Sequence, residues 1–176
     1  MSIQYLENEE IYTRVVLEGI LEAKTSVWIA TANVKDLRIK EGKKYVSVIK
    51  KFGRLCEEGV EVRILHSGIP SELFMKDLKN YELNSLKNFS MRRCPRVHFK
   101  SVLMDGSNLF IGSPNLTGAG LGAKSANRRN FEIGIFTQNN ELINDVKTLF
   151  LKIWKGEMCP NCGRKNICYV PLEEPG

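Results

Sequence analysis

The chain has 176 residues, of which 43% are hydrophobic, and it carries a net charge of +6. This length and apolar content suit one globular domain with a buried core. No apolar run approaches the roughly 18 residues that span a bilayer, and the acidic start MSIQYLENEEIYTR is unlike a signal peptide. We therefore expect a cytoplasmic protein without stable membrane insertion.

The positive charge is concentrated in one part of the sequence. Between Glu82 and Glu132 the only acidic residue is Asp105, whereas eight residues are basic, so this segment has a net charge of +7. The rest of the chain sums to about −1. A field confined to one segment suits a polyanionic partner, either nucleic acid or an anionic lipid surface, and the simpler alternative is a solvated basic face.

The first half of the chain alternates helical and strand patterns. Apolar residues at helical spacing predict a helix over 12–23, and SVWIATANV (26–34) then predicts a buried strand. A second helix is expected over 45–56, ended by Gly59, before the strand VEVRILH (60–66). The segment that follows is less regular, with a helix expected in ELFMKDLKNYELNSLKNF and a loop in MRRCPR.

The second half begins with two strands, VHFKSVLMD (97–105) and NLFIGS (108–113), joined by a turn-forming Asp-Gly-Ser-Asn sequence. A Gly- and Ala-rich loop is expected over 117–127, then the strand FEIGIFT (131–137) and a last helix capped by Asn140. Helices and strands with short joints predict an α/β fold with a mixed, mostly parallel central sheet flanked by helices.

The composition changes abruptly after Gly156. The segment EMCPNCGRKNICYVPLEEPG holds three of the five cysteines and three of the six prolines, and it has no helical period. We therefore expect one domain over 1–155 and a small Cys-rich element over 156–176.

Six residues stand at a fixed spacing in the strand–turn–strand segment: His98-x-Lys100, Asp105, then Gly112-Ser113-x-Asn115. His98 and Lys100 alternate with Phe99 and Ser101, so in a strand both would point to one face. This pattern resembles the signature of the phospholipase D superfamily, H-x-K-x4-D followed by G-S/T-x-N. The flanking helices and strands resemble the fold of that superfamily over residues 1 to about 155.

The residue types suit phosphoryl chemistry. A neutral imidazole, with a free pKa of about 6.5, can attack phosphorus near neutral pH. Lys100 can offset charge on the non-bridging oxygens, and Ser113 and Asn115 can donate to the same oxygens, each contributing roughly 3 kcal/mol. The simpler alternative for His98 alone, a hydrogen-bonded core histidine, is disfavoured by the five partners at matching positions.

The resemblance also implies supporting roles. A glutamate shortly after the motif orients the histidine in small nucleases of the superfamily, and Glu132 stands at the corresponding place, although it could instead be a solvated carboxylate at a strand end. Asp105 and Gly112 are expected to support the turn and the strand. The basic residues expected to contact substrate phosphates are Arg93, Arg96, Lys124, Arg128 and Arg129. GAGLGAKS (118–125) is not a nucleotide-binding loop, because alanine precedes its lysine.

Cleavage through a phosphohistidine needs a second group that protonates the leaving oxygen. Members of the superfamily usually bring two motifs together, and this chain has one. Short single-motif members pair two chains, so we expect a homodimer in which two copies of His98 meet. The competing residue within the chain is His66, at the end of a predicted strand.

Three cysteines of the C-terminal segment have the spacing of a zinc knuckle: Cys159-x2-Cys162-x5-Cys168. Cys94, in the loop before the motif, is the expected fourth ligand, ahead of Cys56 and His66. The alternatives are an iron–sulfur cluster, a disulfide with a free thiol, or reduced cysteines. Any zinc would be structural, because this type of catalysis needs no metal.

The sequence therefore predicts a metal-independent phosphodiesterase, most simply an endonuclease that cleaves DNA or RNA. One alternative is a phospholipid hydrolase of the phospholipase D type. The other is a catalytically silent module that binds nucleic acid through its basic residues.

Overall fold

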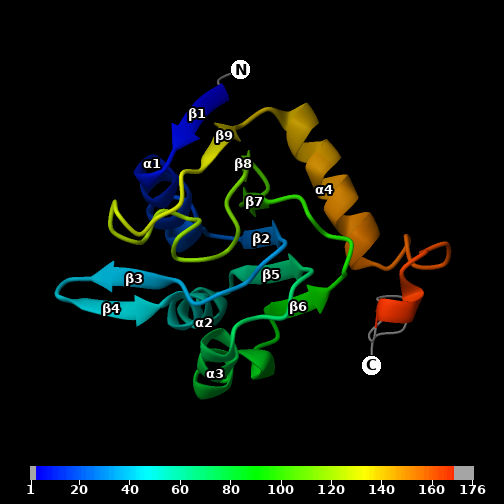
Figure 1. Ribbon diagram of the computed structural model, residues 1–176, viewed down its shortest axis with the longest axis horizontal. Helices are drawn as coiled ribbons and strands as arrows, with labels where there is room; N and C mark the ends of the chain where they lie inside the picture. Colours follow the sequence, from blue (N-terminus) through cyan, green and yellow to red (C-terminus); the bar gives the residue numbers. More distant parts are fainter. Residues whose placement is uncertain (1–2, 169–176) are drawn as a thin grey trace.

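A seven-stranded sheet in the order β1-β9-β8-β7-β2-β5-β6 forms the centre of the molecule, and β3 and β4 form a separate hairpin (Figure 1). The structure is a computed structural model that describes residues 3–168. The strands are β1 Ile3–Glu7, β2 Ser26–Thr31, β3 Arg38–Glu41, β4 Lys44–Ser47, β5 Glu61–His66, β6 Phe89–Arg93, β7 Ser101–Met104, β8 Asn108–Gly112 and β9 Ile133–Thr137.

The sheet is mixed, and its two kinds of pairing are segregated. β5 lies between β2 and β6 and is parallel to both, whereas the other four pairings are antiparallel. The α/β class and the mixed sheet are thus confirmed, but the expectation of mostly parallel pairing applies only to β2, β5 and β6. For β7 and β8 the physical reason is the short turn after Met104, because a connection of this length can join only antiparallel strands.

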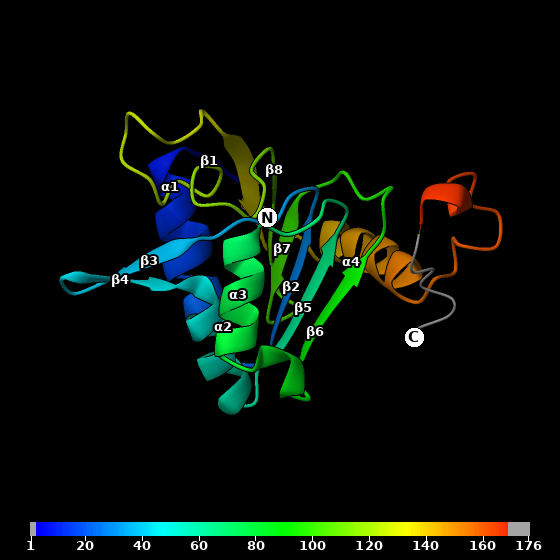
Figure 2. The same ribbon diagram turned by 60° about the horizontal axis from the view of Figure 1, so that its bottom comes forward.

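Helices cover both faces of the sheet. α1, α2 and α3 lie on one face and α4 lies on the other, while the hairpin projects away from the sheet (Figure 2). The helical segments are α1 Glu9–Ile11, continued by a π-helix Tyr12–Leu17 and a 3-10 turn Ile20–Glu22, then α2 Val48–Glu57, α3 Glu72–Asn80, α4 Asn140–Trp154, and 3-10 turns at Leu83–Ser85 and Lys165–Ile167.

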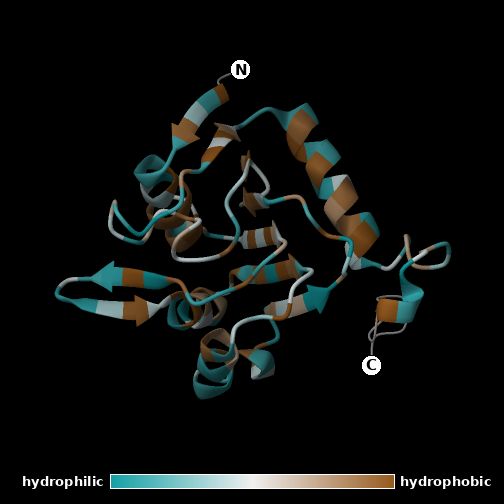
Figure 3. Ribbon diagram, viewed as in Figure 1, coloured by the Kyte–Doolittle hydropathy of each residue, from teal (hydrophilic) through white to brown (hydrophobic). Residues whose placement is uncertain are grey.

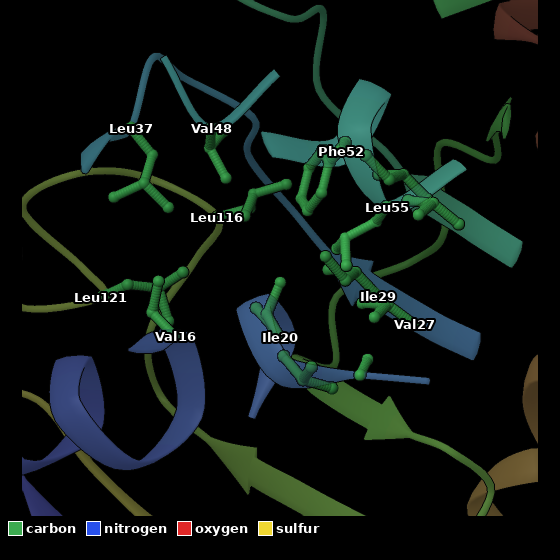
Figure 4. Close-up of a cluster of buried hydrophobic side chains, with 14 of the residues drawn as sticks. Val16, Ile20, Val27, Ile29, Leu37, Val48, Phe52, Leu55, Leu116 and Leu121 are labelled. Carbon is green, nitrogen blue, oxygen red and sulfur yellow. The ribbon is translucent and has the colours of Figure 1, made fainter. Parts of the chain in front are cut away.

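The main core lies between the sheet and the α1–α2 side. Val27 and Ile29 of β2 face Ile20, Phe52 of α2 and Leu116 from the loop after β8 (Figure 4). These five side chains are at most 2% exposed, so this layer carries most of the hydrophobic stabilisation that the fold has.

A smaller core forms under α4. Polar and apolar residues alternate along this helix (Figure 3), and the apolar ones meet the sheet. Phe150 stacks on Trp28 of β2 with ring centroids 5.3 Å apart, and on Trp154 at 5.5 Å. Asn139 caps α4 by accepting from the Leu142 N–H at 2.9 Å, one residue before the expected cap.

Several boundaries differ from the predicted ones. β1 and the β3–β4 hairpin were not expected, and α2 begins only at Val48, where Ser47 accepts from Ile49 N. β6 ends at Arg93 and so covers half of the segment expected to be a loop. The strand expected over 97–105 begins at Ser101, and the one expected over 131–137 begins at Ile133.

Within residues 3–168 no helix is both long and apolar enough to cross a bilayer. The described part of the expected Cys-rich element consists of turns and the Lys165–Ile167 turn of 3-10 helix. The remainder of that element, 169–176, lies outside the described residues.

Candidate active site

The motif residues converge on one edge of the sheet. β2, β5 and β6 end there side by side, at Thr31, His66 and Arg93. β7 begins at this same edge, β8 ends there and β9 begins there, because these strands alternate in direction. Residues that flank the strand ends are therefore gathered although they are distant in sequence.

His98 and Lys100 lie in the extended segment just before β7. Val97 and Phe99 pack into the core under α4, so the alternating His98 and Lys100 face away from it. His98 is exposed and Lys100 is half-buried. The Lys100 ammonium donates to the His98 carbonyl at 2.8 Å, which places the positive charge beside the histidine.

Ser113 and Glu132 meet across the β8–β9 pair. The Ser113 hydroxyl donates to the Glu132 carboxylate, and the Asn130 amide donates to the same carboxylate at 3.0 Å. The backbone of Glu132 is held as well, since its N–H donates to Asn8 Oδ1 at 3.2 Å and its carbonyl accepts from Asn8 N at 3.0 Å. The carboxylate is thus fixed at the site, while its contact with the His98 ring stays a prediction.

Asn115 is bound through its oxygen. Oδ1 accepts from the N–H groups of Ala32 and Asn33, at 3.1 and 3.0 Å, and from the Thr31 hydroxyl at 3.3 Å. The segment that follows β2 therefore fixes the amide. Because the oxygen is engaged, the amide nitrogen is the group that Asn115 can direct to a phosphate oxygen.

Asp105 supports the turn between β7 and β8. Its carboxylate accepts from the N–H groups of Lys24, Thr25 and Ser26, at 2.7–3.2 Å, and from the Thr25 hydroxyl at 3.1 Å. Burial alone would raise the pKa of Asp105, but these donors outweigh it and hold the pKa below its ordinary value. The turn is thereby tied to the start of β2.

This pKa sets a pH dependence of stability. Asp105 binds a proton less readily in the folded chain than in the unfolded chain, so its stabilisation is full above the unfolded pKa of about 3.9 and is lost as the pH falls through the folded value. We expect Asp105→Asn to lose about 1–2 kcal/mol at pH 7 and a smaller amount at pH 2. Urea unfolding at both pH values measures this, and equal losses at both would contradict it.

Gly112 faces Gly134 across the β8–β9 pair. A Cβ at Gly112 would stand 2.5 Å from the Ile133 carbonyl oxygen, and one at Gly134 would stand 2.4 Å from the Phe110 ring. The two strands therefore approach at a distance that only glycine permits, which fixes Ser113 relative to Glu132. The sequence did not point to Gly134, Asn8 or Asn130. Asn8 is 124 positions from its partner Glu132, and Asn130 lies in the irregular segment just before Glu132.

The basic residues fall into three groups. Arg129 is paired with Glu9 at 3.0 Å and ties the loop after β8 to α1. Arg93 donates to the Ser67 carbonyl at 2.9 Å, and with Arg96 it lines a hollow formed by cysteines. Lys124 and Arg128 line a second, separate hollow.

This second hollow, of about 290 Å³, lies between the β3–β4 hairpin and the loop after β8. Arg38 and Tyr45 of the hairpin line it opposite Lys124 and Arg128 of the loop. Tyr45 is 62% exposed. One concave surface, which we call the hairpin groove, is therefore lined by Lys124, Arg128 and the accessible Tyr45 ring, together with Arg38, whose charge is offset by Asp36 at 2.8 Å and Asp77 at 3.5 Å.

His66 occupies the end of β5 but is only 6% exposed. Its Nδ1 lies 2.8 Å from the Gly68 carbonyl. Burial lowers the pKa of His66, the Gly68 contact partly opposes this, and the nearby Arg93 charge lowers it further. The His66 ring is therefore buried within the sheet edge, whereas His98 is exposed.

All five cysteines are free thiols. Cys56 of α2 lies in the main core, where burial raises its pKa to about 11. It does not line the hollow formed by the other four cysteines. A single small hollow of about 20 Å³ is lined by those four: Cys94, Cys159, Cys162 and Cys168. Among residues 3–168, however, no three His, Cys, Asp or Glu side chains are already arranged around a point where a metal ion could bind.

Comparisons with known proteins agree on the fold. Nuc from Salmonella typhimurium, a phospholipase D family member, has a TM-score of 0.61 with 22% identity over 88% of this chain and 94% of Nuc. NucT from Helicobacter pylori has a TM-score of 0.60 with 16% identity over 86% of this chain and 95% of NucT. TrmBL2, an archaeal chromatin protein with a novel mode of DNA binding, has a TM-score of 0.54 with 13% identity over 88% of this chain and 52% of its own.

No curated protein matches the sequence. A family model described as "Cardiolipin synthase, PLD-like domain" matches residues 16–154, a range that contains every motif residue from His98 to Glu132. The family model matches most of the chain, and the solved structures share the fold of this chain. The chain therefore belongs to the PLD-like domain family of the phospholipase D superfamily.

Proposed function

We propose that the protein is a metal-independent endonuclease that cleaves DNA or RNA through a phosphohistidine at a site shared by two copies of the chain. The observation that carries this proposal is the gathering of His98, Lys100, Ser113, Asn115 and Glu132 at one sheet edge. An exposed imidazole beside an ammonium and two neutral donors suits attack on a phosphodiester.

The reaction has two balanced steps. His98 attacks phosphorus with its imidazole lone pair, the P–O bond to the leaving oxygen breaks, and the second His98 gives that oxygen a proton. Water then attacks the phosphohistidine, the second His98 takes the proton from the water, and the P–N bond breaks to release the first. Lys100 and Asn115 hold the phosphate oxygens in both steps, and Ser113 joins them when its one hydroxyl proton turns from the Glu132 carboxylate to the phosphate.

An uncovered apolar face next to the site supports pairing of two copies. Ile3, Tyr5 and Ile133 lie on the β1–β9 part of the sheet, and they are 63%, 56% and 55% exposed. Phe131, beside Glu132, is 96% exposed. Exposed apolar side chains grouped next to an incomplete site suit a second copy that supplies the missing histidine.

The hairpin groove supports nucleic acid as the substrate. Two of its basic residues, Lys124 and Arg128, lie on the loop between Ser113 and Glu132, so a polymer bound in the groove would lie next to the segment that connects these two site residues. Basic residues on a concave surface neutralise backbone phosphates, and an exposed tyrosine can stack on a base. A phospholipid has one headgroup and would leave most of this groove unused.

Removal of a groove cation is expected to change the salt dependence of binding. Lys124→Ala and Arg128→Ala should each weaken binding of DNA by a similar factor for all sequences, and each should reduce the slope of log K against log salt by about 1. Fluorescence anisotropy over a salt series measures both effects. Lys152→Ala, which removes an exposed charge from α4, is the control. An equal change in slope for this variant would show that the hairpin groove is not the binding surface.

The substrate class is tested by incubating the protein in EDTA with single-stranded DNA, duplex DNA, RNA and anionic phospholipid vesicles. Cleavage of a nucleic acid by the wild type and not by His98→Ala supports the proposal. Release of a lipid headgroup alone would make the protein a phospholipid hydrolase instead. Binding of nucleic acid without any cleavage would make it a silent binding module.

A further inference from the structure

We propose that Cys94, Cys159, Cys162 and Cys168 together bind one zinc ion, and that this ion fastens the C-terminal element to the loop that leads to His98. Two independent observations support the site. Three of these residues have the spacing of a zinc knuckle, and the structure brings all four, from segments more than sixty residues apart, to one hollow.

The backbone already places the cysteines in turns. The Cys94 N–H donates to the His66 carbonyl at 2.8 Å, which fixes the loop directly after β6. The Cys162 N–H donates to the Cys159 carbonyl at 3.0 Å, so the first knuckle pair forms a tight turn. Cys94 and Cys159 both pack against the core under α4, and this shared contact brings the two segments together.

The size of the hollow suits a single ion. Its volume of about 20 Å³ is close to the space that one water molecule needs. A four-thiolate site in proteins holds zinc or an iron–sulfur cluster. The turn spacing of Cys159 and Cys162, which is that of a zinc knuckle, favours zinc, and metal analysis of the protein distinguishes the two. The thiols line the hollow without yet converging, so binding requires their half-exposed side chains to rotate inward.

The surrounding charge suits such a site. Four thiolates around Zn²⁺ carry a net charge of −2, which is costly to bury without compensation. The same hollow is lined by Arg93, Arg96, Arg164 and Lys165. These positive side chains would offset the net negative charge of the occupied site, and their position assigns Arg96 and Arg93 to the cysteine site rather than to substrate.

The C-terminal element is held to the loop by further contacts. Arg164 Nη1 of this element donates to the Pro95 carbonyl of the loop at 3.4 Å. The end of α4, just before the element, is held to β6, because Arg92 Nη1 donates to the Trp154 carbonyl at 2.6 Å. Pro95 and Cys94 are three and four residues before His98. An ion at this position would therefore stabilise the segment that presents the nucleophile without touching the substrate.

The test uses the full chain carrying His98→Ala, so that metal binding is measured independently of cleavage. We expect elemental analysis to find about one zinc per chain, and Co²⁺ replacement to give the intense thiolate charge-transfer bands of a tetrahedral site. Cys94→Ser and Cys162→Ser should each weaken zinc affinity by about 100-fold or more, measured by competition with a chelator dye. Removal of zinc should lower Tm.

Cys56→Ser is the matched control, because it changes a core thiol outside the hollow and should leave the zinc content unchanged. If the folded His98→Ala chain takes up neither Zn²⁺ nor Co²⁺, the proposal is wrong. Iron with acid-labile sulfide in place of zinc would also overturn it, as would equal loss of zinc in Cys56→Ser and Cys94→Ser. None of these outcomes bears on whether the wild type cleaves nucleic acid.

Discussion

His98→Ala is expected to reduce the rate of phosphodiester cleavage by about 10⁴-fold or more, because it removes both the nucleophile and, in the second copy, the general acid. The fold should be unaffected, since His98 is exposed and its neighbours Val97 and Phe99 provide the packing of that segment. Single-turnover cleavage of labelled DNA or RNA measures the loss, and thermal unfolding checks the fold.

Lys76→Ala is the matched control for this experiment. Lys76 is an exposed basic residue of α3, outside the groups assigned to the site, and its removal lowers the net charge without touching the motif. The control should retain full activity. Cleavage by His98→Ala at a tenth or more of the wild-type rate, a loss of only about 1.4 kcal/mol, would show that another group attacks phosphorus.

Mixed dimers separate the shared site from a site within one chain. When wild-type and His98→Ala chains are co-refolded, a heterodimer has one histidine where two are needed. We expect its activity to approach that of the homodimeric variant. Heterodimers that keep half of the wild-type activity would show that each chain cleaves alone, and His66 would then be the candidate for the second proton-transfer group.

Gly112→Val is expected to give the largest loss of stability among single substitutions in the site. Even a methyl group would stand 2.5 Å from the Ile133 carbonyl, and both groups belong to backbone that is held in the β8–β9 ladder. Overpacking of this kind costs about 3 kcal/mol or more, which for a chain of this length lowers Tm by about 6–12 °C.

Gly53→Ala is the comparison for Gly112→Val. Its Cβ would meet only the end of the flexible Leu83 side chain, at 3.3 Å, and alanine favours the helix that contains it. We expect Tm to change by no more than about 2–3 °C, as for a change below 1 kcal/mol. Differential scanning calorimetry measures both variants, and a similar Tm for both would refute the close approach of β8 and β9.

The sequence predicted the α/β class and the order of the main elements because their apolar patterns are strong. It also predicted which residues flank strand ends. His98 and Lys100 precede β7, Ser113 follows β8 and Glu132 precedes β9, and the structure brings these strand ends to one edge of the sheet. The cysteine spacing likewise predicted a group that the fold gathers around one hollow.

The missed features depend on contacts between distant residues. The β3–β4 hairpin consists of two strands of four residues, RIKE and KYVS, which are too short and too poor in apolar residues to show a strand period in the sequence. β1 is exposed at four of its five positions and is defined only by its pairing with β9. The contact of Asn8 with Glu132 joins residues 124 positions apart, and no local pattern encodes it.

The pairing of β1 with β9 has a consequence for synthesis of the protein. Among the described strands β1 is translated before all the others, and the strand with which it pairs, β9, begins at Ile133. Contacts of such long range form late, so β1 stays unpaired until nearly the whole domain is translated. Asn8, which fixes Glu132, arrives with it. We therefore expect Glu132 to reach its fixed position only after β1 docks, so that the candidate site is completed late in the folding of the domain.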